Sequence, residues 1–374
     1  MHGDSVALTQ KLIQFKSLNP PGDEAELVEF LGNFLRDAGM VVEIYEFAPN
    51  RPSIVAKTPS ADGTYPLVFG GHIDVVPLGD ADWSVAPFDA EIVGDKLFGR
   101  GASDMKSGIA AAVTATLNQM RKTPNLKRGV TLVIAAGEET GCEGSLHIGR
   151  EAGLEGAELL IVPEPSSNLP VVAHKGSLRL VVTARGKTCH SSMPWVGDNA
   201  IDKVSRWITD LDGLKFEPEA HPFLGWTTAS VTTISGGLNI NSVPDEAHFT
   251  VDMRVVPGTR HSDIIETLQT LWGEGVEIEV VTELEGFHTD PDCPAIAPVL
   301  DLLEQRLGYR PKPTSQPYFT DASALVPAFD NVPTVVIGPG EAEQCHQTDE
   351  YCSVQAIRDS TELYEHIIEG LCGQ

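Results

Sequence analysis

The chain has 374 residues, 41% of them hydrophobic and 21% charged, which is typical of a globular protein large enough for two domains. Its 53 acidic residues outnumber its 26 basic residues and give a formal net charge of −27. A field of that sign repels phosphate backbones and anionic lipid, which argues against nucleic acid and membranes as partners. No apolar run approaches the roughly eighteen residues of a membrane-spanning helix.

The N-terminus and the cysteines indicate where the protein works. Residues 1–16 carry an acid and lack the apolar core and small-residue cleavage site of a signal peptide, which favours a cytoplasmic protein. Six cysteines show no C-x-x-C pair and no regular spacing, so we expect reduced thiols. They are Cys142, Cys189, Cys293, Cys345, Cys352 and Cys372.

The first half of the chain alternates helix and strand patterns. In chain order, the apolar spacing predicts helices over 5–16 and 23–38, strands over 41–47, 53–57 and 65–70, a helix over 105–120, a strand over 130–136, a helix over 143–152 and a strand over 159–162. This β-α-β alternation predicts an α/β fold with a mostly parallel mixed sheet flanked by helices.

The middle of the chain has a different order of elements. From Ser177 a strand pattern is followed by a helix over 200–211, strands over 227–234 and 247–255, a helix over 263–272 and a strand over 276–282. That is the β-α-β-β-α-β order of an α+β ferredoxin-like domain. The chain then returns to a helix over 295–307, a strand over 334–338 and a helix over 354–369. We therefore predict a main domain in two parts, 1–175 and 292–374, and an inserted domain over 176–291.

Five polar clusters follow strands or lie in loops of the main domain. They are HID at 72–74, GRGASDMKSG at 99–108, AAGEETG at 135–141, VPEP at 162–165 and CHQTDE at 345–350. Ligands of an open α/β sheet gather beyond the carboxyl ends of its strands, so clusters that are distant in the chain can meet there. Imidazole and carboxylate donors, with no cysteine in the expected places, favour zinc or a similar divalent ion.

Each cluster has a plainer interpretation when it is taken alone. Asp104 could cap the helix that follows it, and His346 could be an ordinary loop histidine. The adjacent acids Glu138 and Glu139 could be a solvated pair, but they directly follow an apolar strand, where a carboxylate can keep a raised pKa and serve as a base. Glu164 lies between two prolines, and such a rigid backbone suits a metal ligand.

Two other classes of protein lack their motifs here. To form a phosphate-binding loop, GRGASDMKSG would need glycines in place of Arg100 and Met105. The chain also contains no G-x-S-x-G sequence, so a Ser-His-Asp hydrolase finds no support.

Several longer motifs occur in order along almost the whole chain: GGHIDVVP, FGRGASDMKSG, GEETGCEGS, PEP, GKTCHSSMPWVGDNAI, NSVPDE, DMR and CHQTDE. This set resembles the co-catalytic zinc metallohydrolases, a family that includes acetylornithine deacetylase and succinyl-diaminopimelate desuccinylase of amino-acid biosynthesis, glutamate carboxypeptidase and aminoacylase. The resemblance implies a zinc-exopeptidase-like catalytic domain and an inserted lid domain through which many members dimerise, so we expect a homodimer.

The resemblance also implies two divalent metal ions, zinc in the first place and cobalt or manganese as alternatives. Asp104 would bridge the two ions. His72 and Glu164 would complete one metal position, and Glu139 and His346 the other.

Two further residues of the main domain receive roles from the same resemblance. Glu138 would be the general base that takes a proton from the attacking water. Asp74 would hydrogen-bond the far nitrogen of His72 and fix its tautomer, a contact within reach because residues i and i+2 of a strand share a face. The family often has a cis peptide bond after the bridging aspartate, here Asp104–Met105.

Five residues are expected to contact the substrate. His190 resembles the histidine that holds the oxyanion, commonly in the partner subunit's site, although a plain loop histidine is the alternative. Arg254 and Asn241 would bind the substrate carboxylate, which the guanidinium fork matches, although Arg254 could also be a structural arginine on an exposed strand. Gly338 and Gly340 would let the backbone come close to the substrate.

Residues 320–325, TDASAL, depart from the glycine-rich run that relatives often show, which leaves that wall of the pocket undefined. Cys142 and Cys189 are unusual neighbours for such a site, and we expect packing thiols.

The expected activity is hydrolysis of the amide bond in a small N-acyl amino acid with a free carboxylate, of the deacetylase or desuccinylase type. The alternative within the same class is a carboxypeptidase or dipeptidase of the glutamate-carboxypeptidase type. A non-catalytic binding protein on the same fold is the alternative of a different class. It would have lost a ligand or the base, and none is missing from the sequence.

Overall fold

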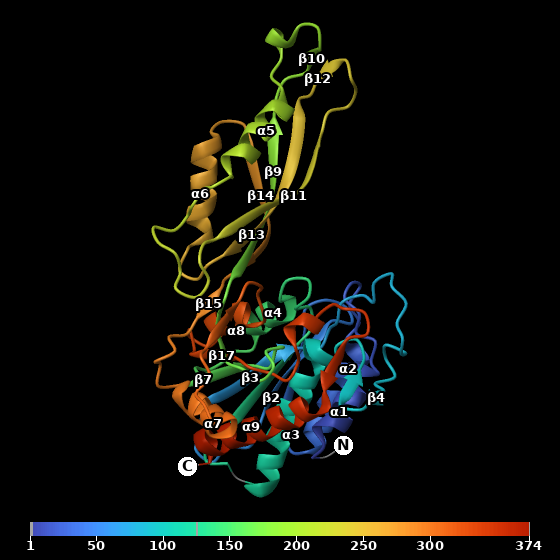
Figure 1. The fold of residues 1–374 in the computed structure, drawn as a ribbon, viewed down its shortest axis with the longest axis vertical. Coiled ribbons are helices and arrows are strands. Elements are labelled where there is room, and N and C mark those ends of the chain that lie inside the picture. Colours follow the sequence, from blue (N-terminus) through green and yellow to red (C-terminus); the bar gives the residue numbers. More distant parts are fainter. Residues whose placement is uncertain (1–2, 125, 374) are drawn as a thin grey trace. The chain divides into compact units, whose positions relative to one another are not determined.

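The computed structural model describes residues 3–124 and 126–373, and its internal contacts divide the chain into two compact units (Figure 1). Unit 1 consists of Met1–Ala173, His288–Ser315 and Thr320–Gln374, and unit 2 consists of His174–Phe287 and Gln316–Phe319.

Unit 1 is built on a nine-stranded mixed sheet, which confirms the predicted α/β architecture. Its strands run in the order β1 (Val41–Glu46), β2 (Pro52–Lys57), β6 (Val130–Ala135), β3 (Leu67–His72), β7 (Leu159–Val162), β17 (Thr334–Val336), β8 (Val171–His174) and β15 (Phe287–His288), with β16 (Thr314–Gln316) beside β8. The four central strands, β6, β3, β7 and β17, are parallel to one another. Every residue of β3, β6 and β7 is buried, as expected of parallel strands covered on both faces.

Helices cover both faces of this sheet. On one side α1 (Ser5–Ile13), α3 (Ser107–Lys122) and α9 (Val354–Cys372) pack together, and on the other side α4 (Glu143–Glu151) packs on α8 (Ala322–Ala328). A Cβ added to Gly70 would meet Leu325 of α8, whereas one added to Gly71 would meet Ile109 of α3 and Met105, which lies just before that helix. Successive strand residues point to opposite faces, so α8 and α3 lie on opposite sides of β3. The remaining helices of the unit are α2 (Ala25–Asp37) and α7 (Ala297–Leu307).

The start of α3 differs from the prediction. The sequence pattern predicted a helix from Met105, but a π-helical turn, η1 (Ala102–Lys106), precedes α3, which begins at Ser107. Asp104 and Met105 have non-helical backbone angles within this turn, and the peptide bond between them is cis, as the family resemblance implied. Asp104 lies before the first turn of α3, and its side chain does not cap this helix. The capping interpretation was therefore wrong.

A small three-stranded sheet supports the loops of the site. It pairs β18 (Tyr351–Ser353) with β5 (Lys96–Phe98), which pairs in turn with β4 (Ile92–Val93). The sheet thus joins the segment that follows the 3-10 turn η3 (Ala342–Gln344) to the segment that leads into η1.

Unit 2 has the ferredoxin-like order predicted from its sequence. Its four-stranded antiparallel sheet runs β11 (Thr228–Gly236), β13 (Glu246–Val255), β9 (Gly176–Arg185) and β14 (Val276–Leu284). The helices α5 (Ala200–Asp210) and α6 (His261–Trp272) pack on one face over a core that includes Phe249, Trp207 and Trp272. At one end of this unit a short ribbon pairs β10 (Cys189–His190) with β12 (Ser242–Val243), next to the 3-10 turn η2 (Pro194–Val196) (Figure 1).

Among the described helices, none combines the length and the hydropathy needed to cross a bilayer.

Candidate active site

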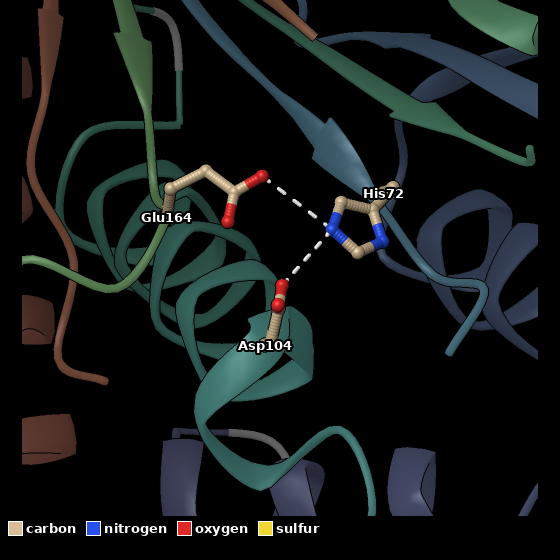
Figure 2. Close-up of side chains that lie close together, drawn as sticks. All are labelled: His72, Asp104 and Glu164. Carbon is tan, nitrogen blue, oxygen red and sulfur yellow. Dashed lines mark hydrogen bonds and ion pairs between the residues drawn. The ribbon is translucent and has the colours of Figure 1, made fainter. Parts of the chain in front are cut away.

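His72 is the last residue of β3, and its imidazole is buried with only 1% of its surface exposed. Its Nε2 atom lies 3.2 Å from Oδ1 of Asp104 and 3.4 Å from Oε1 of Glu164. Figure 2 shows the two carboxylates pointing toward this nitrogen. Asp104 comes from η1, and Glu164 from the loop after β7. Since β3 and β7 are parallel neighbours, the residues that follow them meet at one edge of the sheet.

A second set of side chains lies on the other side of Asp104. Nε2 of His346 is 3.5 Å from Oδ2 of Asp104 and 3.2 Å from Oε2 of Glu139. Glu139 follows β6, the other parallel neighbour of β3, while His346 lies between η3 and β18 with a left-handed backbone, at a φ of 63°. One oxygen of Asp104 therefore faces each histidine.

The structure thus brings all five predicted ligands together in two groups that share Asp104. His72, Asp104 and Glu164 form one group, and Asp104, Glu139 and His346 form the other. Within each group the potential ligand atoms all lie within 4.8 Å of one another. A carboxylate that belongs to both groups has the arrangement of a bridging ligand.

The charges of the two groups fit a pair of divalent cations. Three carboxylates face two imidazoles, and Oε1 of Glu139 is buried with no hydrogen-bond partner among the described residues. Burial opposes the charged form of His72, but the carboxylates of Glu164 and Asp104 outweigh it and hold the His72 pKa well above its usual value. Burial and the charge of Asp104 raise the Glu164 pKa to about 8. The site therefore holds more negative charge than its own residues neutralise, and its oxygen and nitrogen donors suit zinc and similar ions.

Glu138 is buried beside these groups. Among the described residues, neither ligand group includes it. Burial raises its pKa well above the ordinary value for a glutamate, and the charges of Glu139 and Glu164 raise it further. A carboxyl group with these properties can take up a proton and hold it in a site crowded with negative charge.

Asp74 contacts the far nitrogen of His72, as expected, but its closer contact is made by the backbone. The hydrogen bond to Nδ1 of His72 comes from the carbonyl oxygen of Asp74, at 3.0 Å, while its carboxylate Oδ1 lies 3.5 Å from that nitrogen. The carboxylate instead accepts hydrogen bonds from the amides of Gly137, Glu138 and Glu139, at 2.9, 3.2 and 3.2 Å. Asp74 thus orients His72 through its backbone and the Glu138–Glu139 turn through its side chain.

Gly338 and Gly340 are close to protein backbone. A Cβ on Gly338 would lie 2.3 Å from the carbonyl oxygen of Pro163, and a Cβ on Gly340 would lie 2.5 Å from that of Ser103. These two glycines let their loop approach the turns that carry Glu164 and Asp104. Their contact with a substrate stays a prediction.

In unit 2 the structure brings His190 and Asn241 together. His190 pairs with Ser242 across the β10–β12 ribbon, and the amide of Ser191 donates to the carbonyl of Asn241 at 3.0 Å. Nδ1 of His190 accepts a hydrogen bond from the amide of Ser192 at 3.2 Å. A neutral imidazole that accepts at Nδ1 carries its proton on Nε2, so His190 presents an exposed N–H donor.

Arg254 lies away from these two residues. It is near the C-terminal end of β13 and pairs with Asp252, its Nε atom 2.9 Å from Oδ1, and its guanidinium lies over the ring of Phe319. The β10–β12 ribbon extends from the opposite end of β13, beyond Glu246. At about 3.3 Å per strand residue, Arg254 and the ribbon are roughly 26 Å apart or more. One small molecule cannot touch both within a single copy of unit 2.

Sequence reasoning missed three buried charged residues near the site. Glu350 and Arg100 form an ion pair at 2.8 Å, and Asp321 accepts a hydrogen bond from Ser145. Burial raises the Asp321 pKa to about 6. The motifs CHQTDE, GRGASDMKSG and TDASAL contained all three, but only their distances show what they contact.

All six cysteines are free thiols. Cys142 is fully buried with its Sγ 3.5 Å from the carbonyl of Thr320, and burial raises its pKa well above the usual value. Cys189 lies with Sγ 3.3 Å from the carbonyl of Met193. Both are in packing contacts.

An α/β domain with paired ligand groups at its strand ends and an adjacent buried glutamate defines a metal-dependent hydrolase. A model of peptidase family M20/M25/M40 matches residues 68–370, and the chain belongs to this family.

Known relatives and solved structures are similar to this chain over most of its length. A probable succinyl-diaminopimelate desuccinylase of Staphylococcus epidermidis is 29% identical over 399 residues, covering 98% of this chain and 97% of the relative. An acetylornithine deacetylase of Erwinia tasmaniensis is 29% identical over 360 residues, covering 92% and 91%. The crystal structure of an M20 family metallo-carboxypeptidase from Sulfolobus solfataricus has the same fold, with a TM-score of 0.79, 18% identity and 98% of each chain covered.

Proposed function

We propose that this metallohydrolase cleaves the amide bond of small N-acyl amino acids, as a deacetylase or desuccinylase. The observation that carries the proposal is the pair of ligand groups that share Asp104 beside the buried Glu138. The names of the two relatives at 29% identity support acetyl or succinyl as the acyl group.

The metal ligands are proposed to be His72, Asp104, Glu139, Glu164 and His346, with Asp104 shared by two divalent ions. Zinc suits these nitrogen and oxygen donors, and cobalt or manganese can replace it. When bound, the two ions supply Lewis-acid polarisation of the scissile carbonyl and lower the pKa of water.

Glu138 is proposed to carry a proton from the attacking water to the leaving amine. As water adds to the carbonyl carbon, Glu138 takes one of its protons, which its raised pKa allows. When the C–N bond breaks, Glu138 delivers that proton to the nitrogen of the leaving amine. Asp74 holds the backbone of Glu138 in place through the amide hydrogen bond.

The substrate is proposed to contact three residues of unit 2. Arg254 pairs with the free carboxylate through its guanidinium fork, Asn241 donates to the same group, and Nε2 of His190 donates to the oxyanion as it forms.

We infer a homodimer from the positions of these residues. Because Arg254 and the ribbon that carries His190 are too far apart for one small substrate, we infer that His190 and Asn241 act on the site of a partner subunit. β11 is an exposed edge strand. Leu238, just beyond it, is 94% exposed and Trp195 is 76% exposed, as expected of a surface that a second copy covers.

A carboxypeptidase or dipeptidase remains the second candidate, because it would use the same metal groups and base on a peptide bond. The Sulfolobus solfataricus neighbour, described as a metallo-carboxypeptidase, supports it. A panel of acetyl-, succinyl-, formyl- and aminoacyl-amino acids, assayed with added zinc, cobalt or manganese, tests the choice. Turnover of acetyl or succinyl substrates at least tenfold above dipeptides supports the deacylase. The reverse order supports the peptidase, and two bound ions with no turnover of any substrate overturn both.

A further inference from the structure

Glu350 is a fully buried carboxylate that none of the roles above uses. It follows His346 in the CHQTDE motif and directly precedes β18. Its Oε1 accepts hydrogen bonds from the amides of Ser103 at 2.8 Å and Asp104 at 3.0 Å, and its Oε2 accepts one from the amide of Gly101 at 3.0 Å. One side chain therefore holds the backbone of the whole turn that presents Asp104.

Arg100 completes this arrangement, and it is only 1% exposed. Its Nη1 donates to Oε2 of Glu350 at 2.8 Å and to the carbonyl of Gln347 at 3.1 Å. Its Nη2 donates to the carbonyl of Pro77 at 3.2 Å. Gln347 directly follows His346, and Pro77 lies in the loop that follows His72. The guanidinium thus ties together the loops of both histidines.

These contacts are charge-assisted and shielded from water, so they are stronger and more directional than ordinary surface hydrogen bonds. None of these hydrogen bonds uses a potential ligand atom of the two groups. These protein contacts hold the backbone at Asp104 and at Gln347, the residue after His346.

We propose that Glu350 and Arg100 form a clamp that positions Asp104 and His346 and thereby sets the affinity of both metal positions. The inference rests on the proposed metal centre. Glu350 acts through Asp104, so it is a positioning residue. Since Asp104 belongs to both groups, loss of the clamp weakens binding of both ions.

The test compares Glu350→Gln with Glu24→Gln in the full-length chain. Glu24 is a matched control because it is also fully buried, with its Oε2 2.8 Å from Nε of Arg51. Its side chain accepts no hydrogen bond from the amides of 101–104 within the described part of the chain. Metal is removed with a chelator, and each protein is titrated with Co²⁺, followed by its visible absorption, and with Zn²⁺ in competition with a chromophoric chelator.

We expect Glu350→Gln to weaken both binding steps by roughly 10- to 100-fold and to alter the cobalt spectrum, as loss of a group that orients a ligand does. Glu24→Gln should lower the unfolding midpoint and leave both affinities unchanged. If the two variants shift metal affinity equally, or Glu350→Gln binds like the unaltered chain, the clamp is wrong.

Arg100→Lys keeps the positive charge but lacks the forked guanidinium group. It is the variant to test if Glu350→Gln does not fold. We expect it to weaken chiefly the ion held by Asp104, Glu139 and His346, because its bond to Gln347 is lost. Unchanged affinity in Arg100→Lys would contradict the clamp. If the unaltered chain binds no metal, the metal centre and the clamp both fail, whereas metal binding without hydrolysis would contradict only the proposed activity.

Discussion

Oδ1 of Asp74 accepts a hydrogen bond from the backbone amide of Glu138 at 3.2 Å. The same carboxylate binds the amide of Glu139 through Oδ2, which also accepts from the side chain of Asn19 at 2.8 Å. Burial alone would raise the Asp74 pKa, but the contact with His72 and the hydrogen bonds from Asn19 and the Glu138 amide hold it below its usual value. A fully buried, charged carboxylate thus anchors the turn that carries both the proposed base and a proposed ligand.

We expect Asp74→Asn to impair catalysis more than metal binding. The asparagine side chain would turn an N–H group toward backbone N–H donors, leaving at least one buried donor unpaired and costing about 1–3 kcal/mol of unfolding free energy. Because the turn of Glu138 would lose its anchor, kcat should fall roughly 10- to 100-fold. Denaturant unfolding, metal analysis and steady-state kinetics measure these effects. Asp62→Asn, in an exposed loop, is the control, and a wild-type kcat in Asp74→Asn would contradict the anchoring role.

Glu138 and Glu139 are adjacent in the chain, and their replacement by glutamine should affect metal content and turnover differently. Glu138→Gln should keep its metal and lose about 10²- to 10⁴-fold in kcat, because an amide cannot accept the proton. Glu139→Gln should lose metal, because Glu139 belongs to a ligand group. Elemental analysis of both variants, purified in parallel, separates base from ligand. Loss of metal from Glu138→Gln would show that Glu138 is itself a ligand.

The general position of the site could be predicted because its residues follow apolar runs. His72 ends β3, and Glu139 and Glu164 follow the adjacent buried strands β6 and β7; parallel strands present their ends at one edge. The fold class could be predicted for the same reason, since strand and helix periods alternate clearly in unit 1 and change order in unit 2.

Contacts made by loops could not be predicted. The buried position of Glu350 depends on the path of the chain after His346, which no local pattern specifies. The start of α3 was misplaced because the helical spacing continues through Met105, while Asp104 and Met105 have non-helical backbone angles. The bond from His72 to the Asp74 carbonyl was missed because side-chain chemistry alone favours the carboxylate.

Buried His174 should make stability depend on pH. Burial lowers its pKa to about 4, and Nδ1 is hydrogen-bonded to the carbonyl of Lys175 at 3.0 Å. An unfolded histidine titrates near 6.5, so between about pH 6.5 and 4 the unfolded chain binds more protons. This stabilisation is complete above pH 6.5 and is lost as the pH falls toward 4, with a slope of up to about 1.4 kcal/mol per pH unit.

His174→Gln should remove that contribution. Denaturant unfolding of the metal-free protein at several pH values between 4 and 7 gives the difference in slope from the unaltered chain. His366→Gln, at an exposed position, is the control. Equal slopes for His174→Gln and the unaltered chain would show that folding does not lower the His174 pKa.

Mixed dimers should show whether His190 crosses to a partner. His190→Ala and Glu138→Gln, each with its own affinity tag, are co-expressed, and the doubly tagged heterodimer is isolated. If His190 serves the partner's site, one of the two sites in the heterodimer combines an intact Glu138 with an intact His190. Turnover should then return to about half that of the unaltered dimer, because closed two-fold symmetry gives two equivalent sites.

The two parent homodimers set the background for this measurement, since each lacks one group at both sites. If His190 acted within its own chain, each site of the heterodimer would still lack one group, and turnover would stay at the background. A dimer that forms without rescue would contradict the crossing of His190. It would also require the substrate to bridge a distance of roughly 26 Å along β13 within one chain, which a small N-acyl amino acid cannot do.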